Sequence, residues 1–215
     1  SPAAVARLMS PLPNSSSASG SAVPGPAHPD PVGSAGEYSP EERELLLHLA
    51  HQAIDSALQD REPALPAIPE HLKQQRGAFT TLYLEGDVRG CVGYVFAVAP
   101  LFQTVIETAC AAAFQDMRFL PVTREEAAQL RISISVLSPL FPIKAEELEL
   151  GKHGLLITQG NHRGLLLPQV PAEHGWDRKT FLEQTCRKAG LAPDAWEHGA
   201  TMEAFTAEIF GEGVL

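Results

Sequence analysis

The sequence predicts an α+β protein, in which an antiparallel-rich sheet with hairpins is flanked by helices. Three observations support this fold class. Helix start signals precede apolar residues at helical spacing, apolar and polar residues alternate over short runs, and two pairs of such runs are joined by short glycine-containing segments. These runs do not follow the strand–helix–strand order of a doubly wound sheet. With 215 residues, 44% of them hydrophobic, the chain is expected to form one main domain with room for a smaller subdomain.

The first predicted helix begins after Ser39. Ser39 and Glu42 have the spacing of a capping box, and Pro40 suits the first helical turn. Apolar residues then recur at helical spacing to about Leu58. An alanine-rich helix is expected over residues 100–114, and its small side chains would allow it to pack closely against a sheet.

The strands are predicted from alternation and turn residues. Residues 78–84 and 88–95 form a first hairpin around a Glu-Gly-Asp turn, and residues 154–158 and 163–167 form a second. Residues 131–137 alternate as a half-buried strand. A last strand is expected where apolar residues alternate with polar neighbours, at Phe205, Ala207 and Ile209.

Two further helices complete the prediction. Thr123 and Glu126 form a capping box for a short helix, and Asp177 caps a helix that ends at Gly190. Before the first helix, a stretch rich in Pro, Gly, Ser and Ala lacks the apolar surface that a packed core needs. We therefore expect residues 1–37 to be a disordered tail or an inter-domain linker, and residues 38–215 to be the folded domain.

Charge and composition disfavour several function classes. The formal net charge is -10, so binding to nucleic acid or to an anionic membrane would need a local basic patch, and the sequence shows none. No apolar run approaches the roughly 20 residues of a membrane helix. Cys91, Cys110 and Cys186 form no CxxC pair, which fits a reducing compartment. We expect a cytoplasmic protein with neither a nucleic-acid nor a membrane partner.

The segment from Asp87 to Gly93 resembles the RGC[IV]G signature (an RGCxG motif) of the AMMECR1 family. Val88 stands where the family usually has leucine, and Met117 where it often has proline. The resemblance covers nearly all of residues 36–213. Further blocks in family order are Gly77–Leu82, Ala112–Phe119, Ile134–Ser138, Gly151–Gly154, Leu166–Val170, Gly175–Trp176 and Lys188–Leu191.

The family resemblance implies partners rather than a reaction. Bacterial and archaeal members resemble the A component of the AmmeMemoRadiSam set, which is named together with a Memo-like protein and a radical SAM protein. Members fused to a Memo-like part are known, and a chain that starts at Ser1 with a linker-like segment fits the second half of such a fusion. A trimmed chain would fit equally well. The cofactor is left unassigned by the sequence.

Cys91 is the main candidate for a reactive residue. In a regular strand Arg89 and Cys91 share a face, so the guanidinium could lower the pKa of the thiol, and Gly90 and Gly93 would leave room or free backbone N–H groups for an approaching group. The alternative is a buried structural cysteine beside glycines that permit close packing, and a bulge at Gly90 would spoil the Arg89 alignment.

Four other residues are weaker candidates. His153, in a predicted loop, could act as a general base or as a turn histidine that bonds to backbone. Asp116 and Arg118 could bind a polar ligand or form a helix-terminating ion pair. Gln169, at a strand end, could line a pocket or satisfy a nearby backbone group. No metal site is predicted, since His48 and His51 lack further ligands.

Two functional hypotheses follow. In the first, the protein is an enzyme or catalytic component with Cys91 as nucleophile or redox thiol, Arg89 as its activator and His153 as base. In the second, it is a non-catalytic module that docks the Memo-like and radical SAM partners. The sequence does not decide between them, and it assigns no substrate.

Overall fold

The computed structural model describes residues 36–213, which divide into two compact units. The first unit contains residues 36–136 and 208–213, and the second contains residues 137–207. Each unit has a four-stranded sheet of its own. Helices and antiparallel strand pairs are mixed throughout, which confirms the predicted α+β class. Residues 1–35 of the predicted tail or linker lie outside the described residues.

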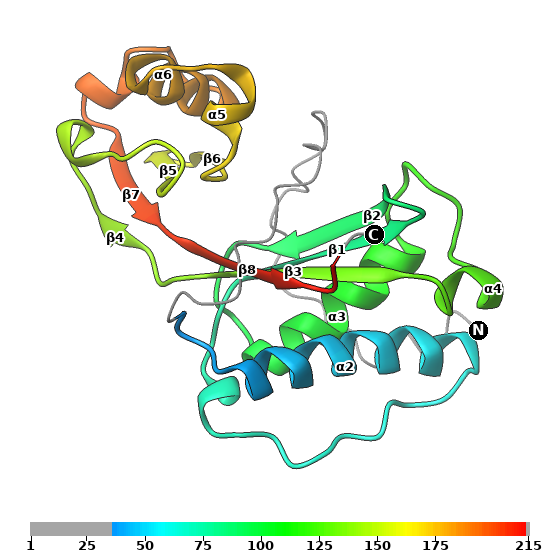
Figure 1. Ribbon diagram of the computed structural model, residues 1–215. Coiled ribbons are helices and arrows are strands. Elements are labelled where there is room, and N and C mark those ends of the chain that lie inside the picture. Colours follow the sequence, from blue (N-terminus) through cyan, green and yellow to red (C-terminus); the bar gives the residue numbers. More distant parts are fainter. Residues whose placement is uncertain (1–35, 214–215) are drawn as a thin grey trace. The chain divides into compact units, whose positions relative to one another are not determined.

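The first unit combines three helices, one 3-10 turn and four strands (Figure 1). In chain order they are α2 (Pro40–Leu58), η1 (His71–Lys73), β1 (Ala78–Leu84), β2 (Asp87–Tyr94), α3 (Leu101–Phe114), α4 (Arg124–Ala127), β3 (Arg131–Leu137) and β8 (Ala207–Gly211). The sheet order is β2-β1-β3-β8, and β1 pairs antiparallel with both β2 and β3.

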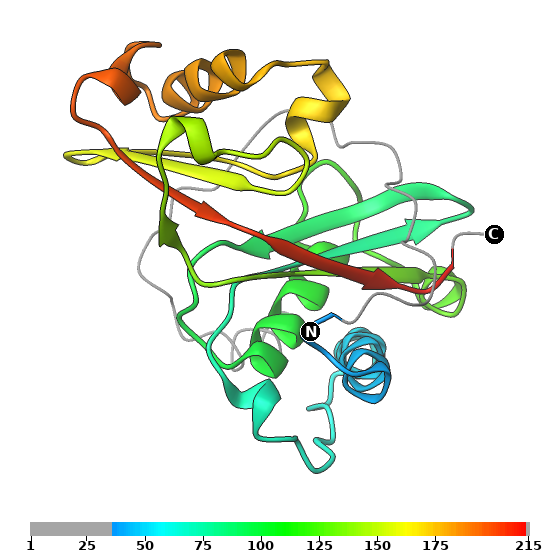
Figure 2. The same ribbon diagram turned by 60° about the vertical axis from the view of Figure 1, so that its left-hand side comes forward.

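Helices α2 and α3 lie on the same face of this sheet, as Figures 1 and 2 both show. Apolar side chains from α2, such as Leu46 and Ile54, share one core with Ala109 of α3 and with Leu82 and Ile134 of the sheet. The small residues of α3 let its backbone approach the strands closely. Within residues 36–213, no helix is long and apolar enough to cross a membrane.

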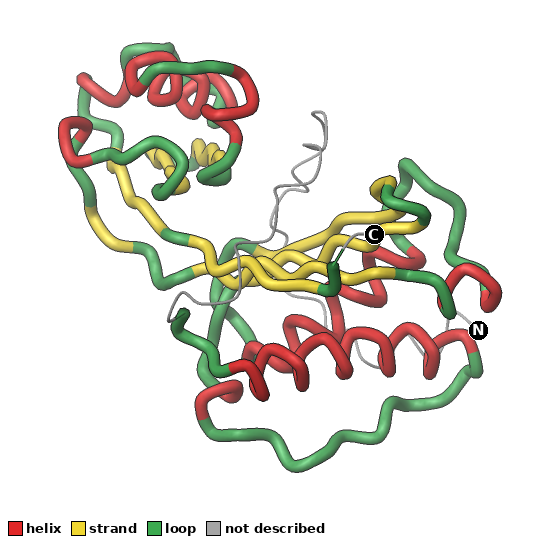
Figure 3. Tube along the Cα trace, in the orientation of Figure 1, coloured by secondary structure: helices red, strands yellow, loops and turns green. Residues whose placement is uncertain are grey.

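Local signals in the sequence set the boundaries of α2 and of the first hairpin. The Ser39 hydroxyl accepts from the Glu42 backbone N–H at 3.2 Å, and the Glu42 carboxylate accepts from the Ser39 N–H at 2.9 Å, so the predicted capping box is confirmed. A long irregular connection follows α2 and leads to η1 (Figure 3). Glu85 and Gly86, with φ of 53° and 91°, form the tight turn between β1 and β2.

The second unit packs helices against a sheet of order β4-β7-β5-β6. Its elements are β4 (Phe141–Pro142), η2 (Ala145–Glu147), β5 (Gly154–Gln159), β6 (His162–Leu166), α5 (Val170–His174), α6 (Arg178–Lys188), η3 (Ala195–Glu197) and β7 (Thr201–Phe205). The predicted hairpin of β5 and β6 and the Asp177-capped helix α6 are both present. Phe181 of α6 and Leu155 of β5 are fully buried in the core of this unit.

The prediction of one last strand is wrong. The chain leaves the second sheet after β7 and enters the first sheet as β8. Between these strands, the Thr206 N–H donates to the Ser138 hydroxyl at 3.0 Å and the Ser138 N–H donates to the Thr206 carbonyl at 2.9 Å. The alternation does not continue past Thr206: Ile209 is 40% exposed and Phe210 is buried. Alternation alone cannot show where a chain changes sheets, because both strands have the same period.

Candidate functional site

The candidate site lies on the face of the first sheet opposite α3, and Gly90 establishes this face. A Cβ atom at Gly90 would stand 2.2 Å from the Ala112 carbonyl oxygen of α3, so position 90 points toward the helix. Successive residues of a strand point to opposite faces, so the Cys91 side chain points away from α3. The half-buried Cys91 lies on the edge strand β2, directly opposite Thr81 of β1.

Thr81 is the direct partner of the Cys91 sulfur. Its hydroxyl donates to Sγ at 3.2 Å. The hydroxyl can also accept, but the donated bond is the one that favours a negatively charged sulfur. On the next strand, Ser133 pairs with Thr81, so a row of thiol and hydroxyl side chains runs across this face from the sheet edge.

Asp116 ties the segment after α3 to this strand. One carboxylate oxygen accepts the Cys91 backbone N–H at 2.9 Å, a group that an edge strand leaves without a ladder partner. The same carboxylate accepts from Arg118 Nε at 2.9 Å, from Nη2 at 2.6 Å and from the Arg118 backbone N–H at 3.2 Å. The predicted ion pair of Asp116 and Arg118 is thus present, and it also anchors β2.

The surroundings of Cys91 shift the pKa of its thiol in opposite directions. Burial raises the pKa of the Cys91 thiol above its ordinary value. The hydrogen bond from the Thr81 hydroxyl and the charge of the Arg118 guanidinium lower this pKa, whereas the Asp116 carboxylate raises it further. The hydrogen bonds from Arg118 hold the pKa of the Asp116 carboxyl down at about 2, with the Cys91 and Arg118 backbone N–H groups contributing. The resting sulfur is therefore mainly a neutral thiol near pH 7.

The expectation that Arg89 lies beside the sulfur is wrong, because β2 is not regular at that point. Leu82 pairs with Gly90 and Tyr83 pairs with Val88, which leaves Arg89 as the extra residue of a bulge. Its guanidinium instead donates to Glu126 of α4, from Nε at 2.9 Å and from Nη2 at 3.1 Å. The cation that acts against the effect of burial on the pKa of Cys91 is Arg118.

The two glycines of the motif make room for packing, which is the structural alternative raised by the sequence. Gly90 admits the backbone of α3. At Gly93, a Cβ would lie 2.2 Å from the Phe79 ring, so this ring fills the space beside the glycine. Both positions would therefore resist any larger residue, whether or not Cys91 reacts.

Comparison with known proteins places this geometry in a family. The sequence profile of the AMMECR1 family matches residues 45–210. The chain belongs to the AMMECR1 family. A relative from Aquifex aeolicus is 41% identical over 177 residues, covering 78% of this chain and 91% of that protein. A Methanocaldococcus jannaschii protein is 38% identical and covers 80% of this chain and 90% of its own length.

A solved structure supports the same assignment. The crystal structure of an uncharacterised protein from Pyrococcus horikoshii matches with a TM-score of 0.69 and 38% identity, covering 80% of this chain and 92% of that one. At this identity the two chains share both family and fold. The AMMECR1 match therefore explains why the blocks recognised in the sequence run through both units, since residues 45–210 span the two.

The remaining candidates of this AMMECR1 protein lie in the second unit. The His153 ring is buried, its Nδ1 accepts from the Glu149 backbone N–H at 3.1 Å, and the ring makes a T-shaped contact with the Phe141 ring. These are the contacts of a turn histidine bonded to backbone. Gln169 is the N-cap residue of α5, where its carbonyl accepts from the Glu173 N–H and its side chain makes no capping bond.

Two partners of the site were not selected from the sequence. Thr81 contacts the sulfur, and Glu126 binds Arg89 as well as closing the capping box of α4. The signal for Thr81 was its place on the strand that pairs with the motif, opposite Cys91. Among residues 36–213, no group of three or more His, Cys, Asp or Glu side chains is arranged to hold a metal ion.

Proposed function

We propose that Cys91 is the reactive thiol of this AMMECR1 protein and that Thr81 and Arg118 tune it. The observation that carries the proposal is the hydrogen bond from the Thr81 hydroxyl to Sγ at 3.2 Å. A hydroxyl that donates to sulfur stabilises the thiolate, which is the nucleophilic form of cysteine. The Arg118 charge acts in the same direction.

In this proposal the thiol works as the catalytic component of a set that includes a Memo-like and a radical SAM protein. Burial keeps the free protein mainly in the unreactive thiol form, which protects the sulfur until a substrate or partner arrives. The compartment would be the reducing cytoplasm, and the three cysteines, all of them free, agree with it.

The proposal is tested by alkylation of the native protein with iodoacetamide between pH 6 and 10, read for each cysteine by mass spectrometry. Cys91 should react faster than Cys110, whose pKa burial raises to about 11, and faster than the buried Cys186. In Thr81→Val, the Cys91 rate near pH 8 should fall about threefold to tenfold, because each pKa unit changes the thiolate fraction tenfold. Arg118→Gln should also lower the alkylation rate of Cys91.

Arg89→Gln is the matched control, since it removes a guanidinium that is paired with Glu126. It should leave the Cys91 rate unchanged. The proposal fails if Cys91 reacts no faster than the other two cysteines, or if Thr81→Val has no effect on its rate.

The second candidate function is a non-catalytic module that docks the same partners. It is favoured by two apolar side chains on the segment after α3: Met117 is 99% exposed and Leu120 is 82% exposed. Binding of a purified Memo-like protein should then be lost in Met117→Asp and kept in Leu65→Asp, the same kind of change at an exposed apolar residue outside this segment. Normal partner binding by Cys91→Ser, together with slow alkylation of Cys91, would favour this module over the thiol.

A further inference from the structure

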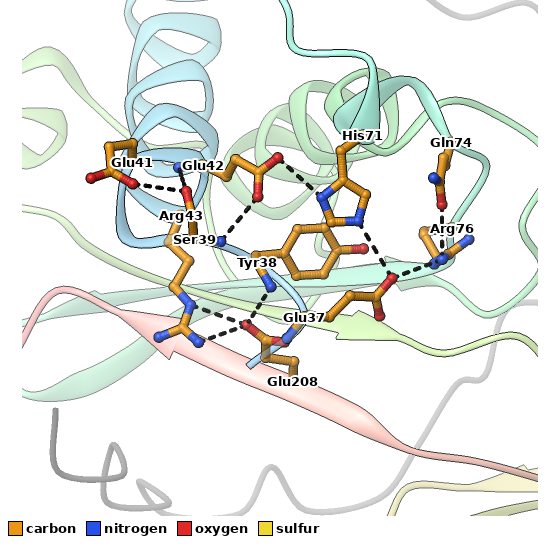
Figure 4. A network of polar contacts seen from close by, with 10 residues as sticks. All are labelled: Glu37, Tyr38, Ser39, Glu41, Glu42, Arg43, His71, Gln74, Arg76 and Glu208. Carbon is orange, nitrogen blue, oxygen red and sulfur yellow. Dashed lines mark hydrogen bonds and ion pairs between the residues drawn. The ribbon is translucent and has the colours of Figure 1, made fainter. Parts of the chain in front are cut away.

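A network of polar contacts fastens the segment that enters α2 to the last strand. The Glu208 carboxylate on β8 accepts from the backbone N–H groups of Glu37 at 2.6 Å and Tyr38 at 3.4 Å (Figure 4). It also accepts from the Arg43 Nε of α2 at 3.0 Å. One carboxylate on β8 thus holds the backbone of the segment that enters α2 and the Arg43 side chain of α2 itself.

Tyr38 anchors the same segment through its ring. The residue is 2% exposed, and its ring stacks on the His71 ring with centroids 4.9 Å apart and an angle of 15° between the planes. Burial raises the pKa of Tyr38 to about 12, so this side chain stays neutral throughout the physiological range. The position of the segment that enters α2 therefore depends on the position of the His71 ring.

His71 stands between two carboxylates, as Figure 4 shows. Its Nδ1 lies 3.0 Å from a Glu42 oxygen, and its Nε2 lies 3.6 Å from a Glu37 oxygen. A neutral imidazole carries a proton on only one of its nitrogens, whereas the imidazolium carries one on each. Only the protonated ring can pair with both carboxylates at once.

Two further hydrogen-bond donors, one charged and one from the backbone, hold these carboxylates in place. Arg76 Nη2, from the segment after η1, donates to Glu37 at 2.8 Å. The second oxygen of Glu42 is held by the Ser39 N–H at 2.9 Å in the capping box. Both carboxylates therefore stay near His71 whatever its protonation state, and the ring is the variable member.

We propose that Glu37, Tyr38, Glu42 and His71 form a proton-linked latch that fixes the segment entering α2. With His71 protonated, the ring bridges Glu37 to Glu42 and the Tyr38 ring is clamped on it. When the ring is neutral, it carries a proton on only one nitrogen and loses one of the two contacts. The latch is thus tight on the acidic side and loosens toward the alkaline side. The latch would control how firmly the segment that enters α2 is held on this unit.

The latch is tested by NMR measurement of solvent exchange at the Glu37 and Tyr38 amides, divided by the intrinsic rate at each pH. The resulting protection factors should fall by about threefold to fivefold between pH 5.5 and 8 in the wild type, as expected for a partly exposed charged contact. In His71→Phe, which can still stack on Tyr38 but carries no ring nitrogen, they should not depend on pH.

His51→Phe is the matched control, because His51 pairs with Glu212 through Nε2 alone. It should keep the wild-type pH dependence at Glu37 and Tyr38. If His71→Phe does not fold, Glu37→Gln provides the same test, since it removes one of the two carboxylates and should weaken the dependence. Flat protection factors in the wild type, or an unchanged slope in the folded His71 or Glu37 variant, overturn the proposal.

Discussion

Asp116 has the most connected carboxylate of the candidate site. It receives the backbone N–H of Cys91, the backbone N–H of Arg118 and two guanidinium donors, while its side chain is only 7% exposed. A carboxylate in such surroundings is stabilised in its charged form, which explains a pKa near 2. The residue therefore links the thiol strand to the segment after α3 by charge as well as by geometry.

Asp116→Asn should destabilise the protein by about 1.5 kcal/mol at pH 7, because the amide replaces charged hydrogen bonds with weaker ones. The folded-state pKa lies below the unfolded value of about 3.9, so the advantage of the wild type is complete above pH 4 and is lost as the pH falls toward 2. Urea unfolding of both proteins from pH 7 to pH 2.5 measures it. A stability difference that does not shrink in acid would contradict this account.

At the level of elements, the contact of β2 with α3 determines what can stand at position 90. The Ala112 carbonyl oxygen is backbone and cannot rotate away, so the helix itself would have to move to admit a side chain. The bulge beside it shifts the register of β2 by one residue. Together these features place Cys91 opposite Thr81 and turn Arg89 toward α4.

Gly90→Ala should therefore cost about 2 to 3 kcal/mol, the usual penalty for overpacking a well-packed contact. Chemical denaturation at neutral pH gives the value. Gly213→Ala is the control, because a Cβ at that position would meet nothing within 4 Å. Equal stability of the two variants would mean that α3 shifts at little cost in free energy. The close approach of α3 would then not explain why residue 90 is glycine.

At the scale of the whole molecule, each of the two described units has a main core of its own. Leu46 belongs to the core of the first unit and Phe181 to that of the second, and each is fully buried. The first unit is discontinuous in sequence, since residues 208–213 return to it after the second unit is complete. Its sheet therefore requires the last strand of the chain.

Phe181→Ala should destabilise the second unit by about 3 to 5 kcal/mol by leaving a cavity. Amide hydrogen exchange should then accelerate more in β5, β6 and α6 than in β1 and α3, because local opening follows the damaged core. Leu46→Ala should give the opposite pattern. Uniform acceleration in both variants would show that the two units open as one.

Much of the fold follows from local features that the sequence displays. The capping box of Ser39 and Glu42 and the alternation in residues 131–137 act over a few residues, so α2 and β3 could be predicted closely. The break at Thr206 could not, because changing sheets alters no local period. Family membership was also readable, since the blocks around Cys91 and Gly154 keep a fixed order along the chain.

The sequence by itself determined much of the secondary structure, the family and the identity of the candidate thiol. Only the tertiary structure decided what surrounds that thiol. In the folded hairpin Leu84 pairs with Asp87 across the turn, and the bulge at Arg89 then puts Cys91, rather than Gly90, opposite Thr81. Asp116, which follows the end of α3, bonds to the Cys91 backbone from 25 positions along the chain and brings Arg118 with it. Such contacts depend on how separate elements pack, and no short-range pattern encodes that packing.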